Sequence, residues 1–364
     1  MNLLEGRVGL QESASAAWIA CVIGGLLTVH TQDSFANGNA SYVATLFAGV
    51  IGLGVFFLVA FVMRARGCET LPALYCHAFG SVIGFVLSII TTLIILYEAM
   101  IPLSRILLVL NRFIFVQASP VAIAMFFVPV VAILAVMGLE SITRTSRLFL
   151  IVIVLAFVIM LVLASPNYKT YRLYPLLGGD LGNLAWQALA GTARYVPVLL
   201  ALLACARGMQ GIGSTSKIAT ITVLTAAVMV SLVQFCLGLS FSSEMLAELP
   251  APLYRLTMST SAGSLHSRID KLLLFSWMIC ALISGGFLCY AAALMYTRAS
   301  GMRDTRPAAL SFSILLCTLA LLAEQETGWL LQIVDFMWHW AWLIAIAPPL
   351  LAAGLSLLKR RKQV

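Results

Sequence analysis

Long runs of apolar residues, each about the length of a membrane-crossing helix, dominate the chain. A helix needs about 20 apolar residues to cross roughly 30 Å of hydrocarbon. Ten segments meet this criterion, and the longest of them leave room for tilt. The predicted spans are residues 13–30, 42–63, 81–110, 119–138, 146–164, 186–206, 219–241, 271–297, 307–323 and 329–357. The pattern therefore predicts an all-α polytopic membrane protein with ten transmembrane helices.

Composition supports this interpretation. Hydrophobic residues make up 62% of the 364 residues, charged residues only 10%, and the mean hydropathy is +1.02. A soluble domain carries about 25% charged residues, so lipid must be the solvent for most of this chain. We expect residues 1–364 to form a single transmembrane domain in the bilayer. The net charge of +8 is spread between apolar runs rather than gathered in one patch, which argues against a nucleic-acid partner.

The positions of Lys and Arg predict the topology. Cytoplasmic loops of membrane proteins carry an excess of these residues. With both termini in the cytoplasm, most of the 22 Lys and Arg, including the basic tail at 359–362, fall inside. The first and last outer loops, 31–41 and 324–328, contain neither residue type. Of the longer outer segments, 242–270 is either a short helix at the membrane interface or an irregular loop.

The ten spans divide into two sets of five, which must have opposite topology because each set is odd. The repeats would cover about 13–164 and 186–357. Transporters built this way often interrupt the first helix of each half, so that free backbone groups contact a ligand near the midplane. Span 1 contains Gly24-Gly25, and span 6 contains Gly191-Thr192 with Pro197 beyond it. We therefore predict that spans 1 and 6 are discontinuous. The alternative is that these residues allow close helix packing or an ordinary kink.

Four ionisable residues within the predicted spans stand out: Glu98, Arg194, Asp335 and His339. Such groups are costly in hydrocarbon and are usually paired or functional. Glu98 and Arg194 both lie roughly 12–14 Å from the outer ends of their spans, so they could meet. Asp335 and His339 are four residues apart and share one helix face. These residues form either structural salt bridges or a polar cavity, in which Arg194 would bind a carboxylate or gate access and Asp335–His339 would act as a gate or proton relay.

A ligand site follows from the second alternative. Exposed N–H groups at the start of a half-helix favour an anionic group, so a carboxylate is the natural anchor. The predicted ligand-binding residues are Gly24, Gly25, Tyr97, Glu98, Gly191, Thr192, Arg194, Tyr195 and Ser284. The sequence contains no catalytic or phosphate-binding motif, and its eight cysteines include no C-x-x-C pair. We therefore expect no enzyme activity, no metal site and no cofactor.

Three short segments in the middle of the chain resemble one known family. They are the G-x-E-x-x-x-R pattern from Gly138 through Glu140 to Arg144, the P-x-L-G stretch from Pro175 to Gly178, and Pro252 followed by Arg268-Ile269-Asp270 and Trp277. In order and spacing they are similar to the spore germination permeases. These are the polytopic B subunits of germinant receptors in the amino acid–polyamine–organocation superfamily.

The resemblance implies a ten-span inverted repeat with spans 1 and 6 unwound, in the inner membrane of a bacterial endospore. It also implies an A-type membrane subunit and a C-type lipoprotein as partners, and a small germinant such as an amino acid, sugar or nucleoside. The family often has an acidic residue in span 6 where this chain has Arg194-Tyr195, so the germinant class does not transfer. The charged motif residues are expected to be architectural: Glu140 and Arg144 would tie span 4 to span 5, and Arg268 and Asp270 would anchor span 8.

Three functions remain open at this point. The chain is a ligand-sensing subunit of a germinant receptor, a free-standing H⁺- or Na⁺-coupled amino acid transporter, or a membrane-embedded enzyme or assembly scaffold. The third requires catalytic groups around a shared cavity, and only Asp335 and His339 could supply them. The first two use the same site, because sensing and transport both require different affinities in two conformations.

Overall fold

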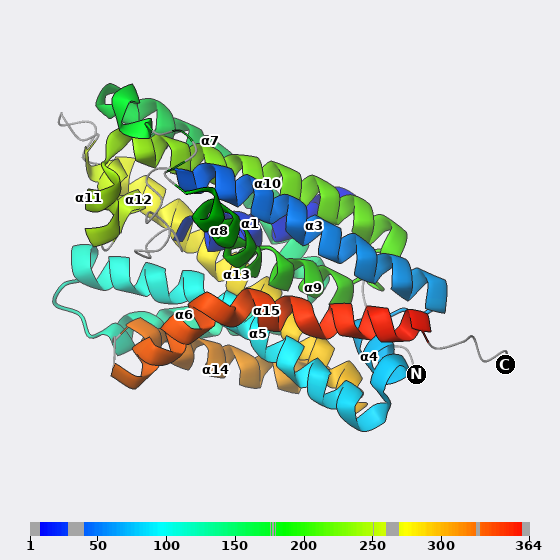
Figure 1. Ribbon diagram of the computed structural model, residues 1–364. Coiled ribbons are helices and arrows are strands. Elements are labelled where there is room, and N and C mark those ends of the chain that lie inside the picture. Colours follow the sequence, from blue (N-terminus) through cyan, green and yellow to red (C-terminus); the bar gives the residue numbers. More distant parts are fainter. Residues whose placement is uncertain are drawn as a thin grey trace.

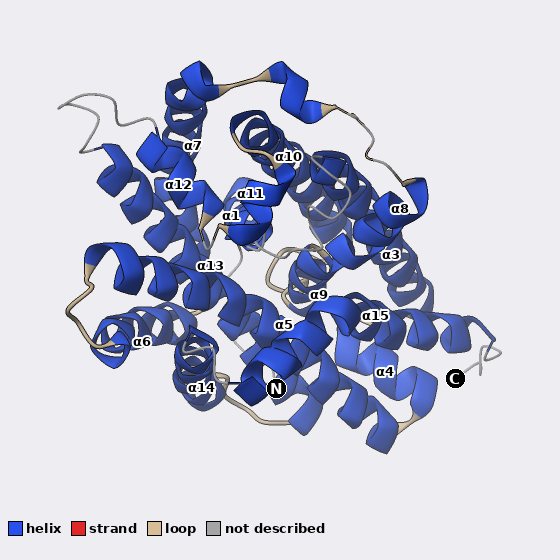
Figure 2. Ribbon diagram, turned by 60° about the vertical axis from the view of Figure 1, so that its left-hand side comes forward, coloured by secondary structure: helices blue, strands red, loops and turns tan. Residues whose placement is uncertain are grey.

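The computed structural model describes residues 8–27, 40–174, 176, 178, 180–249, 251–259, 269–324 and 328–358. Helices and loops make up all of this part of the chain, and it contains no strand (Figure 2). The helices are α1 (Leu10–Leu27), α3 (Ser41–Arg66), α4 (Leu71–Phe79), α5 (Ser81–Val109), α6 (Pro120–Met137), α7 (Leu139–Ala164), α8 (Leu181–Gly191), α9 (Val196–Ala204), α10 (Ile212–Ser240), α11 (Ser243–Glu248), α12 (Pro252–Ser259), α13 (Ile269–Ser300), α14 (Arg306–Glu324) and α15 (Gly328–Leu358).

The ten predicted spans are confirmed within the described residues. Ten segments are long and apolar enough to cross a membrane, and each overlaps one predicted span. The largest differences are at the starts of α7, at Leu139, and α10, at Ile212, which each begin seven residues earlier than predicted. Their first turns are polar, but side chains such as Ser146, which donates to the Ile142 carbonyl at 2.6 Å, satisfy their hydroxyls within the helix. A helix can therefore begin several residues before the apolar run from which its span was predicted.

Short helices occupy two of the connecting segments. The nine-residue α4 begins after Thr70, whose hydroxyl caps the helix by accepting from the Ala73 N–H at 3.4 Å. The sequence pattern did not predict α4, because nine residues are too few to show a clear period. In the segment 242–270, α11 and α12 are helical, so the short-helix alternative is correct for this part of the outer connection.

Burial divides the spans into a central and a peripheral group. The most buried are α13, at 78% of its membrane-spanning window, and α1 and the α8–α9 pair, at 72% each. The α6, α7 and α14 spans are only 33% buried and present exposed apolar side chains such as Phe126 and Leu148 to the surroundings. In Figures 1 and 2, α9 lies inside the bundle beside α3, α5 and α15. The central helices are therefore those that could enclose a ligand, and the peripheral ones face lipid.

Both ends of the described chain lie at the same end of the bundle. The Val8 N–H donates to the Gly208 carbonyl at 3.2 Å, in the segment after α9. Arg66, at the end of α3, donates to the Leu357 carbonyl at 3.1 Å, near the end of α15. An ion pair joins the segments that follow α3 and α9. This arrangement requires an even number of crossings, as the distribution of basic residues predicts.

Candidate functional site

The sixth span is interrupted in its middle. The outer half, α8, ends at Gly191, a single 3₁₀ turn covers Thr192–Arg194, and α9 begins at Val196 with Pro197 as its second residue. Proline cannot donate a backbone hydrogen bond, so the helical ladder cannot continue unchanged through this point. The Thr192 hydroxyl instead donates to the Leu189 carbonyl at 2.6 Å. The predicted discontinuity of span 6 is therefore confirmed.

The first span differs from the prediction. α1 continues without interruption through Gly24 and Gly25 to Leu27, so the prediction of a break at these two glycines is wrong. Residues 28–30, the rest of the predicted span, lie outside the described residues. Instead of breaking the helix, the two glycines allow neighbouring side chains to approach α1 closely. A Cβ at Gly24 would lie 2.5 Å from Oε1 of Glu98, and one at Gly25 would lie 2.9 Å from a Val230 methyl group.

The Glu98 side chain lies in the centre of the bundle, beside Gly24 of α1. Its side chain is only 2% exposed, and Oε1 accepts no hydrogen bond from the described residues. Pro102, one turn later in α5, has no N–H to bond the Glu98 carbonyl. The absence of a side chain at Gly24 provides the space that the carboxylate occupies. The packing alternative for Gly24 and Gly25 is thus correct, but at Gly24 the packed group is a carboxylate.

Arg194 lies opposite Glu98, at the break in span 6. Both side chains line one cavity, together with Tyr97 from the preceding position of α5 and Met337 from α15. Arg194 also interacts electrostatically with Glu98 and with Tyr195. The matching depths of Glu98 and Arg194 along their spans predicted this meeting. The cavity holds only about 20 Å³, enough for about one water molecule.

A second cavity shares Arg194 with the first. Its volume is about 40 Å³, and Ala190 and Arg194 contribute to the walls of both cavities. Its other polar lining residues are Ser41 and Thr45 of α3, Gln187 of α8, Gln234 of α10 and His339 of α15. Since Ser41 begins α3 and Trp186, also in the wall, belongs to the first half of span 6, this cavity lies toward the predicted outer side. We call it the outer cavity and the one at Glu98 the inner cavity.

The neutral polar residues of the outer cavity were missed in the sequence. Thr45 donates to Oε1 of Gln234 at 2.6 Å and joins α3 to α10, while the Ser41 hydroxyl is buried with no partner among the described residues. Gln187 completes this polar wall. A Gln inside an apolar span was the available signal, because its amide needs partners that hydrocarbon does not offer.

The other predicted ligand residues divide by position. Tyr97 lines the inner cavity and Gly191 the outer one. Thr192, Tyr195 and Ser284 are fully buried and line neither cavity. The hydroxyls of Tyr195 and Ser284 have no hydrogen-bond partner among the described residues. They lie in the protein interior around the break rather than on its accessible surface.

The predicted gate on span 10 is partly described. Asp335 and His339 both belong to α15, four residues apart as expected. His339 is in the wall of the outer cavity with Arg194, whereas the Asp335 side chain lies outside the described residues. Trp342, one turn beyond His339, meets Trp186 of α8 edge to face, with ring centroids 5.8 Å apart. This aromatic contact holds α15 against the outer half of span 6.

The charged motif residues lie away from both cavities. Glu140 and Arg144 form an ion pair at 2.6 Å, and both are solvent-exposed and belong to α7. The expectation that this pair ties span 4 to span 5 is therefore wrong, because the motif begins where α6 has already ended. Gly138 separates the two helices with φ +86°, a conformation that favours glycine. Arg268 and the Asp270 side chain lie outside the described residues.

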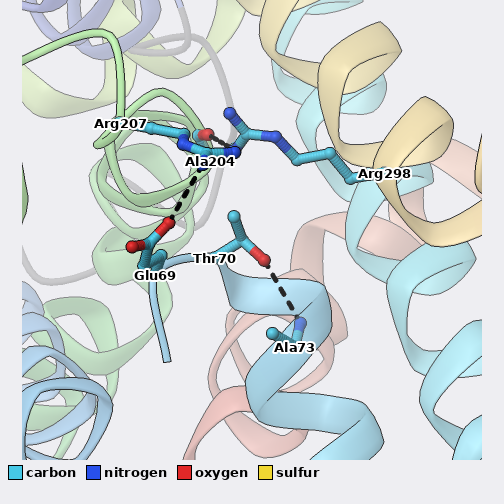
Figure 3. A network of polar contacts seen from close by, with 6 residues as sticks. All are labelled: Glu69, Thr70, Ala73, Ala204, Arg207 and Arg298. Atoms are coloured by element: carbon cyan, nitrogen blue, oxygen red, sulfur yellow. Dashed lines mark hydrogen bonds and ion pairs between the residues drawn. The ribbon is translucent and has the colours of Figure 1, made fainter. Parts of the chain in front are cut away.

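A polar network holds the predicted inner end of span 6 (Figure 3). Arg298 reaches from α13 to donate to the carbonyl of Ala204, the last residue of α9. Arg207, just beyond α9, forms an ion pair with Glu69 at 3.4 Å, immediately before the Thr70 cap of α4. These contacts join the inner half of span 6 to α13 and α4. They fix the position of the predicted inner end of span 6.

Loss of the Arg298 contact should expose the inner end of span 6. Cys205 follows Ala204 directly and is fully buried, so its reaction with a maleimide reports opening. A hydrogen bond to a charged group contributes about 1.5–3 kcal/mol, so Arg298→Ala should speed labelling of Cys205 about tenfold or more in nanodiscs, with the other seven cysteines replaced. Arg303→Ala, in the exposed loop after α13, is the control. Equal labelling rates in the two variants would contradict a stabilising role of Arg298 at this end of span 6.

The fold is that of known membrane transporters. A Na⁺-coupled sialic acid symporter, solved substrate-bound and outward-open, is 13% identical with a TM-score of 0.68, covering 97% of this chain and 79% of the symporter. MhsT in complex with L-phenylalanine is 14% identical with a TM-score of 0.68, covering 96% of this chain and 89% of MhsT. A manganese transporter from Eremococcus coleocola is 12% identical with a TM-score of 0.58, covering 95% and 78%. The likeness includes LeuT-fold structures, in agreement with the predicted inverted repeat of five plus five helices.

Comparison of the amino-acid sequence with family models identifies the family of this chain. The family model for spore germination proteins matches residues 14–328, so the chain belongs to the spore germination proteins. The suspected family is thereby confirmed. No individual curated protein matches the chain. This is a multi-pass, transporter-like germination protein.

Proposed function

We propose that this chain is the ligand-sensing subunit of a spore germinant receptor. The observation that carries the proposal is the position of Arg194, at the break in span 6, between the outer cavity and the buried Glu98. A transporter fold with a central charged site in a germination protein is suited to bind a small molecule. The bound germinant would be an amino acid or a compound of similar size and polarity.

The ligand would enter through the outer cavity and meet Arg194. A carboxylate on the ligand would compete with Glu98 for the guanidinium, because both are anions directed at the same cation. Tyr97 would contact the ligand from the inner cavity. The two cavities hold about 40 and 20 Å³, which is space for water but not for an amino acid. Binding therefore requires the helices around the cavities to move, and this movement is what a partner can detect.

The remaining parts of the proposal concern location and partners. The protein would lie in the inner membrane of the endospore with both termini on the spore-core side, since most of its basic residues fall on that side of the predicted topology. An A-type membrane subunit and a C-type lipoprotein would complete the receptor and read the conformational change. No enzymatic step is required, because the signal is the shift between conformations.

The test is a dose–response measurement on spores that carry the complete receptor. The twenty amino acids, glucose and inosine would be applied singly, and germination followed by loss of optical density. Once a germinant is found, Tyr97→Ala should raise its half-maximal concentration about tenfold, corresponding to about 1.4 kcal/mol of binding free energy. Leu93→Ala, on the same helix but 56% exposed, should leave it unchanged at equal protein abundance.

Two outcomes would overturn the proposal. If Tyr97→Ala and Leu93→Ala shifted the response equally, the site would not lie at the inner cavity. If the purified chain in proteoliposomes, without partners, drove uptake of an amino acid that required an H⁺ or Na⁺ gradient, the chain would be a free-standing transporter. The uptake assay uses the amino acid found in the spore screen, or each of the twenty when none is found.

A further inference from the structure

A groove separate from the central site runs between α1, α7 and α10. Its volume is about 550 Å³, more than ten times that of either central cavity. Most of its wall is apolar or formed by small hydroxyl side chains, including Trp18 of α1, Val154 of α7 and Ile221 of α10. Leu148 and Leu224, which are close in sequence to residues of the groove wall, are 70% and 47% exposed on the surface of the helix bundle. The groove therefore opens sideways, toward lipid.

Two cations lie at one end of this groove. Arg147 of α7 and Lys217 of α10 are in its wall and are solvent-exposed. Arg147 donates to Oε1 of Gln11 at 3.1 Å, and Lys217 has no hydrogen bond or ion pair with any described residue. All three helices begin at this end, which is the predicted cytoplasmic side. Val154 lies seven residues beyond Arg147, so the apolar part extends about 10 Å toward the midplane.

We propose that this groove binds an acidic phospholipid from the inner leaflet. The headgroup phosphate would lie between Arg147 and Lys217, and one acyl chain would pack along Trp18 and Val154. Charge complementarity selects this occupant: basic sites between transmembrane helices on the cytoplasmic side suit anionic headgroups. The apolar length of the groove suits a chain that is tethered to the anion.

The lipid would contact α1, the helix that packs against Glu98 of the central site. Trp18 and Gly24 belong to the same helix, about 9 Å apart along its axis, and Gly24 is in contact with Glu98. A lipid in the groove would pack α1 to α7 and α10 on a face of α1 different from the one that carries Gly24. Its occupancy would therefore favour the conformation in which α1 is held in place.

Trp18 provides the means of testing this inference. The protein would be reconstituted in phosphatidylcholine nanodiscs with a small, fixed fraction of brominated phosphatidylglycerol or brominated phosphatidylcholine. Bromine quenches nearby tryptophan, and the signal of Trp18 among the seven tryptophans is obtained by subtracting that of Trp18→Phe. We expect stronger quenching of Trp18 by the acidic lipid. The affinity for phosphatidylglycerol relative to phosphatidylcholine should fall about 5-fold for each cation removed.

Matched variants make the test specific. Arg147→Gln and Lys217→Gln should weaken the preference for the acidic lipid, whereas Arg144→Gln, one turn from Arg147 and outside the groove, should keep it. Thr225→Phe, inside the groove, should exclude the chain, and Leu224→Phe beside it should not. Equal quenching by both lipids would overturn the proposal, as would absence of quenching by either, which indicates a second copy or a partner helix in the groove. Loss of the preference on adding inorganic phosphate would show a site for free anions and would also overturn it.

Discussion

Replacing Arg194 with alanine should sharply reduce the amount of folded protein in the membrane. The substitution leaves Glu98, which is 2% exposed, without the guanidinium that interacts with it. Removing the opposite charge beside a buried carboxylate costs up to about 3–5 kcal/mol, because the remaining charge stays buried and uncompensated. Glu98→Ala should lower the stability by a similar amount, because it leaves the Arg194 guanidinium without the nearby carboxylate. Thermal unfolding of the purified protein, with its abundance in spore membranes, measures both effects.

The double variant separates folding from sensing. Glu98→Gln combined with Arg194→Met removes both charges and keeps similar volumes, so it should recover most of the lost stability. The same double variant should remain unable to respond to a carboxylate-bearing germinant, because the cation proposed to bind it is gone. If each single variant were as stable as the parent protein, the two side chains would not form an energetically coupled pair. If the double variant responded normally, Arg194 would have no part in sensing.

Hydropathy predicted the number and approximate limits of the spans, because the bilayer imposes the same requirement on every one of them. The polar sequence Gly191-Thr192 followed by Pro197 also predicted the break in span 6. Depth along a helix could be estimated from residue number, and this brought Glu98 and Arg194 together correctly. These features depend on position along one helix axis, which a sequence specifies directly.

The parts that the sequence could not predict depend on the rotation of helices about their axes and on their neighbours. Gly24 and Gly25 form the same dipeptide, but one is in contact with a carboxylate of α5 and the other with Val230 of α10. Ser284 and Tyr195 were expected to line the pocket, but they are buried away from both cavities. Gln234 lines the outer cavity, although its apolar neighbours give no sign of which face it occupies. Packing partners far apart in sequence decide each of these cases.

The two adjacent glycines of α1 should respond differently to substitution by alanine. At Gly25 an added Cβ would lie 2.9 and 3.0 Å from the two methyl groups of Val230. A β-branched side chain in a helix has one preferred rotamer and cannot turn away, so α1 and α10 must separate. Overpacking of this kind costs about 1–3 kcal/mol. Gly25→Ala should therefore lower the unfolding temperature of the purified protein, and Val230→Ala in the same chain should restore it.

At Gly24 the added Cβ meets only the flexible end of Glu98, at 2.5 Å from Oε1. The carboxylate can rotate about its side-chain bonds toward Arg194, so Gly24→Ala should leave the unfolding temperature nearly unchanged. The displaced carboxylate would then hold the guanidinium more strongly and compete better with a ligand carboxylate, which should raise the germinant concentration needed for half-maximal response. Spores carrying Gly24→Ala at normal abundance, compared with the Gly25→Ala, Val230→Ala pair, measure this directly. An unchanged response together with a lowered unfolding temperature would show that Gly24 serves helix packing alone, because a strained backbone rather than a displaced carboxylate would then have absorbed the added methyl group.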